Sequence, residues 1–263
     1  MSRIREAFAH GKAFIPFVTA GYPDLETTGK ILLAAQEAGA DLIELGIPFS
    51  DPTAEGPVIQ TANVKALEGG VTTYRIFEFV EQIRGQIHVP LVFMTYANVI
   101  YSYGKDGSDG FCRRCRDVGI DGLIIADVPF EEKEEFDLPC KKYGLDFISM
   151  IAPTSEDRIQ KIASQADGFI YVVSSMGVTG VRSEITTDIG AITERIREVT
   201  DVPCAVGFGI STPEQAARMA SCSDGAIVGS AIIRLISRWG KDAAPEVGKY
   251  IRSMKEAVEA AGS

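Results

Sequence analysis

Histidine is scarce in this sequence, which contains two among 263 residues. Two histidines make a Ser-His-Asp triad or a histidine-rich metal site an unfavourable interpretation. His10 lies in a predicted N-terminal helix and His88 directly precedes Val89-Pro90, so we expect both side chains at the surface. Any acid-base chemistry then falls to carboxylates.

Long apolar runs and an export signal are also missing. No stretch of about 18 apolar residues is present, and Met1 to Lys12 lacks a basic segment followed by an apolar one and a cleavage site. The five cysteines are an odd number in a chain too large to need disulfides, which favours reduced thiols. These features predict a soluble protein of the cytoplasm.

Cys112 and Cys115 have the spacing of a metal-binding pair, but the rest of a zinc site is missing. Arg113 and Arg114 lie between them, and the segment is typical of a helix in which residues three apart share a face. No second pair of this kind and no nearby histidine completes a ligand set. We expect no metal in this chain.

Positive charge is in deficit, because 26 lysines and arginines face 36 aspartates and glutamates, a net charge of −10. Such a surface repels nucleic acids and anionic membranes. A phosphate ligand would have to be bound locally by backbone N–H groups.

Short β-rich segments alternate with longer amphipathic segments along the chain, which predicts a parallel sheet with crossover helices. Eight such units in about 250 residues favour a closed (β/α)8 TIM barrel. We expect one domain, residues 1–263, with Ser2–His10 as an extra helix closing the bottom. The predicted strands are Ala13–Thr19, Asp41–Leu45, Leu91–Thr95, Gly122–Ala126, Asp146–Ile151, Gly168–Val173, Cys204–Gly207 and Gly225–Val228. The predicted helices are Leu25–Ala38, Thr73–Arg84, Gly110–Val118, Glu131–Tyr143, Glu156–Gln165, Ile189–Val199, Pro213–Ala220 and a C-terminal pair from Ser230 onward.

A weak repeat marks the entrances of the strands. Glycine or aspartate stands just before an apolar run in AGADLIEL, VGIDGLII, YGLDFISM, ADGFIYVV and SDGAIVG. Glycine there suits the left-handed stop after a helix, so each copy predicts a helix-to-strand junction. Active sites of such barrels lie at the opposite, C-terminal ends of the strands.

An acidic segment, ELGIPFSDPTAEGP, follows the second predicted strand and contains Glu44, Asp51 and Glu55. Glu44 stands among apolar neighbours, and a buried carboxyl must be paired or kept protonated with a raised pKa. The second state suits a general acid, whereas the first describes a structural salt bridge inside the barrel. Read alone, Asp51 and Glu55 are equally consistent with a solvated loop.

Glycines follow three successive predicted strands, in GVTG (177–180), GFG (207–209) and Gly229-Ser230. Glycine lets the backbone approach an anion closely, and the helix opening at Ser230 presents free N–H groups and its positive dipole end. Together these segments predict a phosphate site. Tyr171 in the sixth strand needs a partner for its phenol if it faces inward, but an ordinary strand aromatic is an equal alternative, as it is for Tyr96.

The sequence resembles one family over nearly its whole length, the tryptophan synthase alpha subunits. The most specific segment is ELGIPFSDP, whereas GFGIS or GSAI alone would indicate only a phosphate-binding barrel. The segments that carry the resemblance, in the same order and spacing, are PFVTAGYP, ELGIPFSDPTAEGPVIQ, MTYANVI, ADVPFEE, GVTG, GFGIS and GSAI.

The resemblance implies a lyase that splits indole-3-glycerol phosphate into indole and glyceraldehyde 3-phosphate. It assigns Glu44 as the catalytic glutamate, Glu55 as the second catalytic carboxylate, and Tyr171 as a support for substrate near Glu44. Asp51 falls in the loop that communicates with a partner, a pyridoxal-phosphate-dependent beta subunit, in an alpha2beta2 heterotetramer; the chain itself is expected to carry no cofactor. The implied substrate-binding residues are Phe17, Tyr96 and Phe208 beside the indole, and Thr179, Gly180, Gly209, Gly229 and Ser230, most of them at the phosphate.

The sequence departs from the family at two positions of interest. Glu55 replaces the usual aspartate, and its extra methylene could displace the carboxylate by more than about an ångström, a shift that can cost about 100-fold in rate. Ser175 stands where many members have arginine. These departures motivate an alternative, a catalytically weakened barrel that mainly activates the beta subunit. Another phosphate-sugar isomerase or synthase barrel fits less well, because no predicted strand ends in a catalytic lysine or cysteine.

Overall fold

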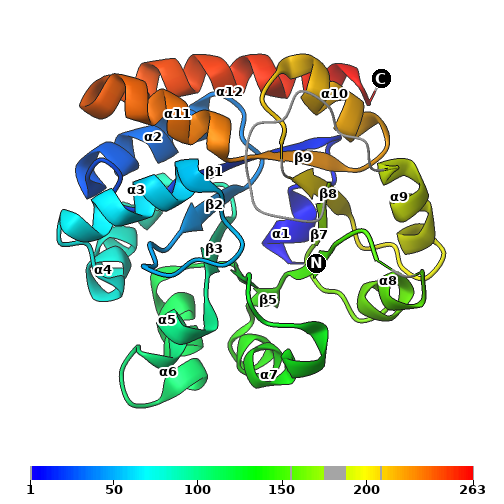
Figure 1. Ribbon diagram of the computed structural model, residues 1–263, viewed down its shortest axis with the longest axis horizontal. Coiled ribbons are helices and arrows are strands. Elements are labelled where there is room, and N and C mark those ends of the chain that lie inside the picture. Colours follow the sequence, from blue (N-terminus) through cyan, green and yellow to red (C-terminus); the bar gives the residue numbers. More distant parts are fainter. Residues whose placement is uncertain (1, 155, 175–187, 208, 263) are drawn as a thin grey trace.

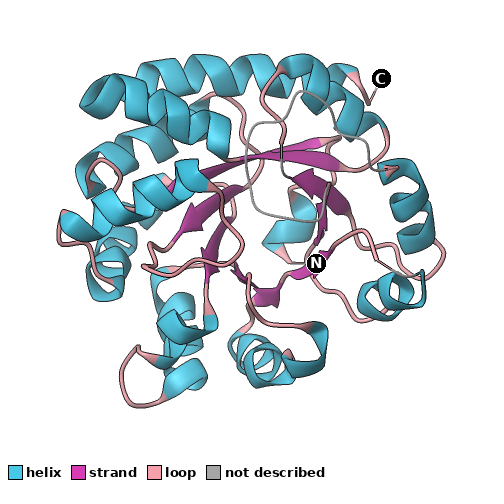
Figure 2. Ribbon diagram, viewed as in Figure 1, coloured by secondary structure: helices cyan, strands magenta, loops and turns pink. Residues whose placement is uncertain are grey.

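The computed structural model describes residues 2–154, 156–174, 188–207 and 209–262. All strand pairs in this part of the chain are parallel, and they form one nine-stranded sheet in the order β5-β4-β3-β2-β1-β9-β8-β7-β6. The sheet curls into a barrel with helices outside it (Figures 1 and 2). The (β/α)8 barrel prediction is confirmed. The strands are β1 Ala13–Thr19, β2 Ile43–Gly46, β3 Leu91–Thr95, β4 Gly122–Ile125, β5 Asp146–Phe147, β6 Ser149–Ile151, β7 Ile170–Val173, β8 Cys204–Gly207 and β9 Gly225–Val228.

The predicted fifth strand is wrong in one respect, because Asp146–Ile151 is divided at Ile148 into β5 and β6. β5 pairs with β4 only, and β6 pairs with β7 only. The two ends of the sheet are therefore consecutive in the chain, and the barrel closes through this short interruption.

Helices surround the barrel and connect successive strands, as the alternating pattern predicts. The α-helices are α1 Arg3–Glu6, α2 Leu25–Glu37, α3 Pro57–Glu68, α4 Thr73–Ile83, α5 Ala97–Tyr101, α6 Gly107–Val118, α7 Glu134–Tyr143, α8 Glu156–Ala163, α9 Ile189–Arg197, α10 Pro213–Ser221, α11 Ser230–Trp239 and α12 Ala243–Ala260. Short 3-10 turns lie at Arg84–Gln86 (η1), Phe130–Glu132 (η2) and Gly240–Asp242 (η3).

Two helices were not predicted, and one predicted helix is shorter than expected. The first unpredicted helix, α3, begins at Pro57 directly after the acidic segment, where a proline suits the first turn of a helix. The second is α5. The N-terminal helix spans only Arg3–Glu6, but it does lie at the bottom of the barrel: Arg3 donates to Asp121 (2.8 Å) before β4, and Ser2 donates to Asp146 (2.6 Å) in β5.

Three aspartates repeat one arrangement at the N-terminal ends of the strands. Asp41, Asp121 and Asp224 each stand just before a strand and accept a backbone N–H from the start of the neighbouring strand. Each also forms an ion pair with a basic side chain. The aspartates of the sequence repeat therefore link adjacent strands, in addition to marking the junctions between helices and strands. The contacts are Phe14 N to Asp41 (2.7 Å), Leu91 N to Asp121 (2.8 Å) and Cys204 N to Asp224 (2.8 Å), with Lys255, Arg84 and Arg197 as the respective bases.

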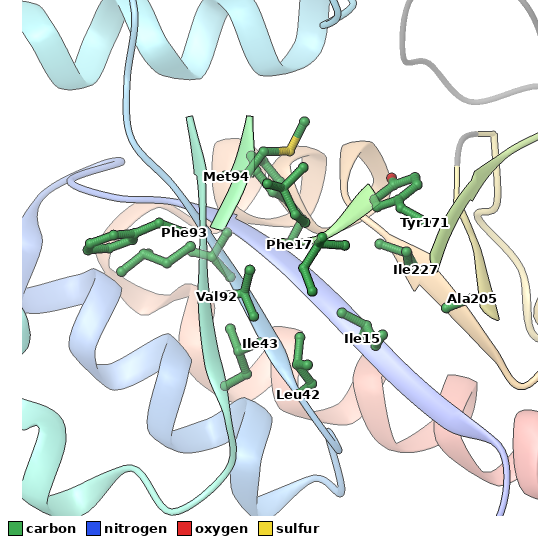
Figure 3. Close-up of a cluster of buried hydrophobic side chains, with 14 of the residues drawn as sticks. Ile15, Phe17, Leu42, Ile43, Val92, Phe93, Met94, Tyr171, Ala205 and Ile227 are labelled. Atoms are coloured by element: carbon green, nitrogen blue, oxygen red, sulfur yellow. The ribbon is translucent and has the colours of Figure 1, made fainter. Parts of the chain in front are cut away.

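Alternate residues of each strand fill the interior of the barrel, because side chains of a strand point to opposite faces in turn. Figure 3 shows Val92 and Met94 on one side of β3 and Phe93 on the other. Phe17, Met94 and Tyr171 gather toward the same interior space in that view. The top of this interior holds the candidate site.

Candidate active site

Glu44 lies on β2 in register with Phe17 of β1 and Val92 of β3. It is 1% exposed, and neither carboxyl oxygen has a hydrogen-bond partner among the described residues. Burial disfavours the charged carboxylate and raises the pKa of Glu44 to about 8. Glu44 is therefore mostly protonated at neutral pH, the state that a general acid needs.

A cavity of about 30 Å³ adjoins Glu44 at the C-terminal ends of the strands. Its lining includes six residues predicted from the sequence and contributed by β1, β2, β7 and the segments after β8 and β9. The barrel thus brings together side chains that are far apart in the chain. The six are Phe17, Glu44, Tyr171, Gly209, Gly229 and Ser230.

Tyr171 faces the interior, and two glycines make room for the aromatic rings of the cavity. A Cβ at Gly207 would lie 2.2 Å from the Tyr171 hydroxyl, and one at Gly46 would lie 2.5 Å from the Phe17 ring. Burial first, and then the nearby Glu44 charge, raise the pKa of Tyr171. The phenol therefore stays protonated beside Glu44 at ordinary pH.

Backbone groups of two successive strand ends line the other side of the cavity. Gly209 has φ +78°, a conformation that favours glycine. Ser230 is the first residue of α11, so free N–H groups of this helix start at the cavity wall. Positive partial charge at a helix N-terminus favours an anion. Thr179, Gly180 and Phe208, also predicted for substrate binding, lie outside the described residues, as does Ser175.

Glu55 is buried just before α3 and, unlike Glu44, has several partners. The Asn63 side chain donates to Glu55 Oε2 at 3.0 Å, and the Tyr96 hydroxyl also hydrogen-bonds to the carboxylate. Burial raises the pKa of Glu55 to about 7, while these two hydrogen bonds act in the opposite direction. Glu55 does not line the 30 Å³ cavity, but Ile59, one helical turn further on, does.

Comparison with known proteins identifies the family. The model of the family described as "Tryptophan synthase alpha chain" matches residues 5–261. This chain belongs to the tryptophan synthase alpha chain family. The tryptophan synthase alpha chain of Lacticaseibacillus casei is 47% identical over 99% of this chain and 97% of its own length. That of Lactiplantibacillus plantarum is 46% identical over 98% and 97% respectively.

Solved structures agree with this assignment. A protein from Aquifex aeolicus superposes with a TM-score of 0.88 at 37% identity, covering 98% of this chain and 99% of its own. Mycobacterium tuberculosis tryptophan synthase gives 0.88 at 32% identity, with 98% of each chain covered. The predicted family and the predicted lyase activity, cleavage of indole-3-glycerol phosphate, are confirmed.

Several residues of the candidate site could not be predicted from the sequence. Asn63 lies in α3, which was not predicted, and an asparagine by itself gives no sign that it binds a buried carboxylate. The apolar lining residues carry no chemical signature, although Met94 and Ile227 follow from strand alternation. The lining residues missed are Ile59, Met94, Ile210 and Ile227.

The remaining predicted residues lie away from the cavity. Asp51 is exposed in the loop between β2 and α3, where its carboxylate accepts from the Ser50 hydroxyl at 2.5 Å. His10 and His88 are exposed, as expected. The buried Cys112 thiol lies 3.8 Å from that of Cys140. Among the described residues there is no cluster of three metal-type ligands, and no helix has the length and apolarity to span a bilayer.

Proposed function

We propose that Glu44 is the proton shuttle of the alpha reaction in this chain. The observation that carries the proposal is a buried carboxyl at the cavity wall without a hydrogen-bond partner among the described residues. Such a group is neutral at the start and free to move between two positions on a substrate. A structural salt bridge, the competing interpretation, has no basic partner in the described part of the chain.

The retro-aldol reaction requires two proton transfers that one carboxyl can perform. Protonated Glu44 first delivers its proton to indole C3, which leaves a carboxylate and a positively charged ring system. The Glu44 carboxylate then removes the proton of the adjacent side-chain hydroxyl. The C–C bond breaks as the aldehyde forms, and its electron pair neutralises the ring, so that indole, glyceraldehyde 3-phosphate and protonated Glu44 result.

Glu55 accepts the hydrogen bond of the indole N–H. Positive charge spreads to this nitrogen when C3 is protonated, so a fixed carboxylate there stabilises the transition state. The hydrogen bonds from Asn63 and Tyr96 favour the charged form of Glu55 that this role needs. Tyr96 thus acts on the indole side through Glu55, while Phe17 borders the ring and Tyr171 supports substrate beside Glu44.

The phosphate binds to the backbone cradle of Gly209, Gly229 and Ser230. We also assign Thr179 and Gly180, which lie outside the described residues, to substrate binding. The described lining of the cavity contains no lysine or arginine, so main-chain N–H groups and the α11 dipole provide the attraction. We assign Phe208, which lies outside the described residues, to indole binding.

Membership of the family supports a beta subunit as partner and indole-3-glycerol phosphate as substrate. We place the chain in a cytoplasmic alpha2beta2 heterotetramer, with residues 1–263 as one domain, the pyridoxal phosphate on the beta subunit, and Asp51 in the coupling loop. The chain itself uses no cofactor. The alternative, an activator with weakened catalysis, was motivated mainly by Glu55. Partners that hold the Glu55 carboxylate in place remove that reason.

The decisive experiment measures indole release from indole-3-glycerol phosphate by the purified chain, with and without a beta subunit. Glu44→Gln keeps the shape of the side chain and removes its proton transfer, so turnover should fall by about 10²- to 10⁴-fold. Glu68→Gln, on the exposed side of α3, is the matched control. Full turnover by a folded Glu44→Gln variant would refute the shuttle, and a wild-type chain that activates the beta subunit but releases no indole would establish the activator alternative.

A further inference from the structure

Glu55 is buried just before α3, and its flexible side chain has to be held in place if its carboxylate is to act on a substrate. The side chain has three rotatable bonds, and fixing them costs conformational entropy. Catalytic groups have to be held within about 0.5 Å of the productive geometry by locked neighbours. The structure shows which neighbour can do this.

Asn63 meets the requirement. Its amide nitrogen lies 3.0 Å from Glu55 Oε2, and the residue is 3% exposed. The contact spans eight positions from the end of the loop into α3, so the Glu55 side chain reaches the helix that follows it. A buried amide donor that loses its acceptor carries the cost of desolvation without the hydrogen bond, so the contact with Glu55 is favoured.

The helix that carries Asn63 is itself firmly packed. Ile59, Ala62 and Ala66 of α3 are buried in the core, and α3 contacts both β1 and α11. α11 is the helix whose first residue lines the phosphate end of the cavity. Through Asn63, the Glu55 carboxylate is therefore attached to a helix that packs directly against α11, which begins at the phosphate cradle.

Two further contacts hold the loop around Glu55. Gln60 donates to the Glu55 carbonyl oxygen at 2.7 Å, and the Ala54 N–H donates to the Tyr96 hydroxyl at 3.3 Å. With the backbone fixed on both sides, the carboxylate end is the part that still needs an anchor. A carboxylate has about four lone-pair sites, so bonds from Asn63 and Tyr96 leave room for an indole N–H.

We propose that Asn63 is the positioning residue for the Glu55 carboxylate. Its amide holds the Glu55 carboxylate against α3, in the orientation that accepts the indole N–H. This inference rests on the role proposed above for Glu55. In this proposal Asn63 binds the Glu55 carboxylate and not the substrate, so its contribution acts through Glu55.

The test is a double-mutant cycle on the purified full-length chain with a beta subunit present. Asn63→Leu, which keeps the side-chain volume and removes the donor, should lower kcat for indole-3-glycerol phosphate cleavage by about 10- to 100-fold. KM should change by less than about threefold, because the phosphate cradle is untouched. Thr61→Leu, exposed on the same helix, is the control and should leave both constants unchanged.

The Glu55→Ala background separates positioning from a general structural effect. There Asn63→Leu should have no further effect on kcat, because no carboxylate remains to be held. An unchanged kcat for Asn63→Leu in the parent chain, or an equal loss in both backgrounds, would overturn the proposal. Full activity of Glu55→Ala itself is a different result, since it would refute the role of Glu55 and not only that of Asn63. Thermal unfolding of each variant identifies any that fail to fold.

Discussion

Two buried glutamates in one site differ in the number of partners that each one has. Glu44 has none among the described residues, whereas Glu55 is bound by Asn63 and Tyr96. A proton shuttle has to move between two substrate atoms, and an acceptor of a fixed N–H has to stay still. Their surroundings thus match the two roles, and the difference arises from neighbours rather than from residue type.

These surroundings predict a bell-shaped pH profile for kcat/KM. The proposed mechanism requires Glu55 to be ionised, so activity should rise as pH increases through its pKa of about 7. The same mechanism requires Glu44 to start protonated, so activity should fall as pH increases through its pKa of about 8. The optimum should lie between these values.

Indole release measured from about pH 5.5 to about pH 9.5 checks this profile. Asn63→Leu removes a hydrogen bond that favours ionised Glu55, and it should move the acidic limb to higher pH while leaving the basic limb in place. A profile that keeps rising above about pH 9 would contradict a protonated Glu44.

At the scale of elements, the predictable parts are those whose signal is local. β1, β3, β8 and β9 have the predicted bounds, because glycine, proline or a helix cap interrupts the chain on each side of a short apolar run. α3 was missed because its first residue, Pro57, ends a segment that otherwise has the composition of a loop. The division at Ile148 depends on which strand each half pairs with, and single-sequence patterns do not contain that information.

The same limit applies to the site. The sequence places Glu44 at a strand end and among apolar neighbours, so its burial could be predicted. The contact between Asn63 and Glu55 could not, since it requires α3 to be known first. Sequence repetition did indicate the strand entrances, but the aspartates Asp41, Asp121 and Asp224 bind the neighbouring strand, and that role appears only in three dimensions.

The strand-entrance aspartates should matter for stability. Asp121 accepts from Leu91 N and pairs with Arg84 and Arg3, with its side chain 12% exposed. Asp121→Asn keeps the shape and removes the charge, so it should lower the free energy of unfolding by about 2 kcal/mol. Urea unfolding measures the loss. The control is Asp117→Asn, because the Asp117 side chain, which pairs with Arg116, is more exposed at 42%. This variant should lose less than about 0.5 kcal/mol. Equal losses in the two variants would show that the contacts of Asp121 do not stabilise the fold more than a surface ion pair does.

At the scale of the whole molecule, the two ends of the barrel hold different features. The aspartate contacts and α1 lie at the N-terminal ends of the strands, and the cavity lies at the C-terminal ends. Substitutions at the bottom should therefore act on folding, whereas those at the top can remove catalysis from an intact barrel. Because the stabilising contacts lie at the opposite end of the barrel, the fold can tolerate the unfavourable burial of the Glu44 carboxyl at the cavity.

The overall charge of −10 leads to a prediction about salt. The phosphate substrate approaches against a negative field, and the described lining of the proposed site offers no lysine or arginine that salt could screen. Raising the ionic strength from about 0.01 M to 0.15 M shortens the screening length from about 30 Å to 8 Å and weakens this long-range repulsion. KM for indole-3-glycerol phosphate should therefore fall by about two- to fivefold, with kcat unchanged, in steady-state assays of the isolated chain. A KM that rises with salt would mean that cationic side chains bind the phosphate, and the backbone cradle would then lose its leading role.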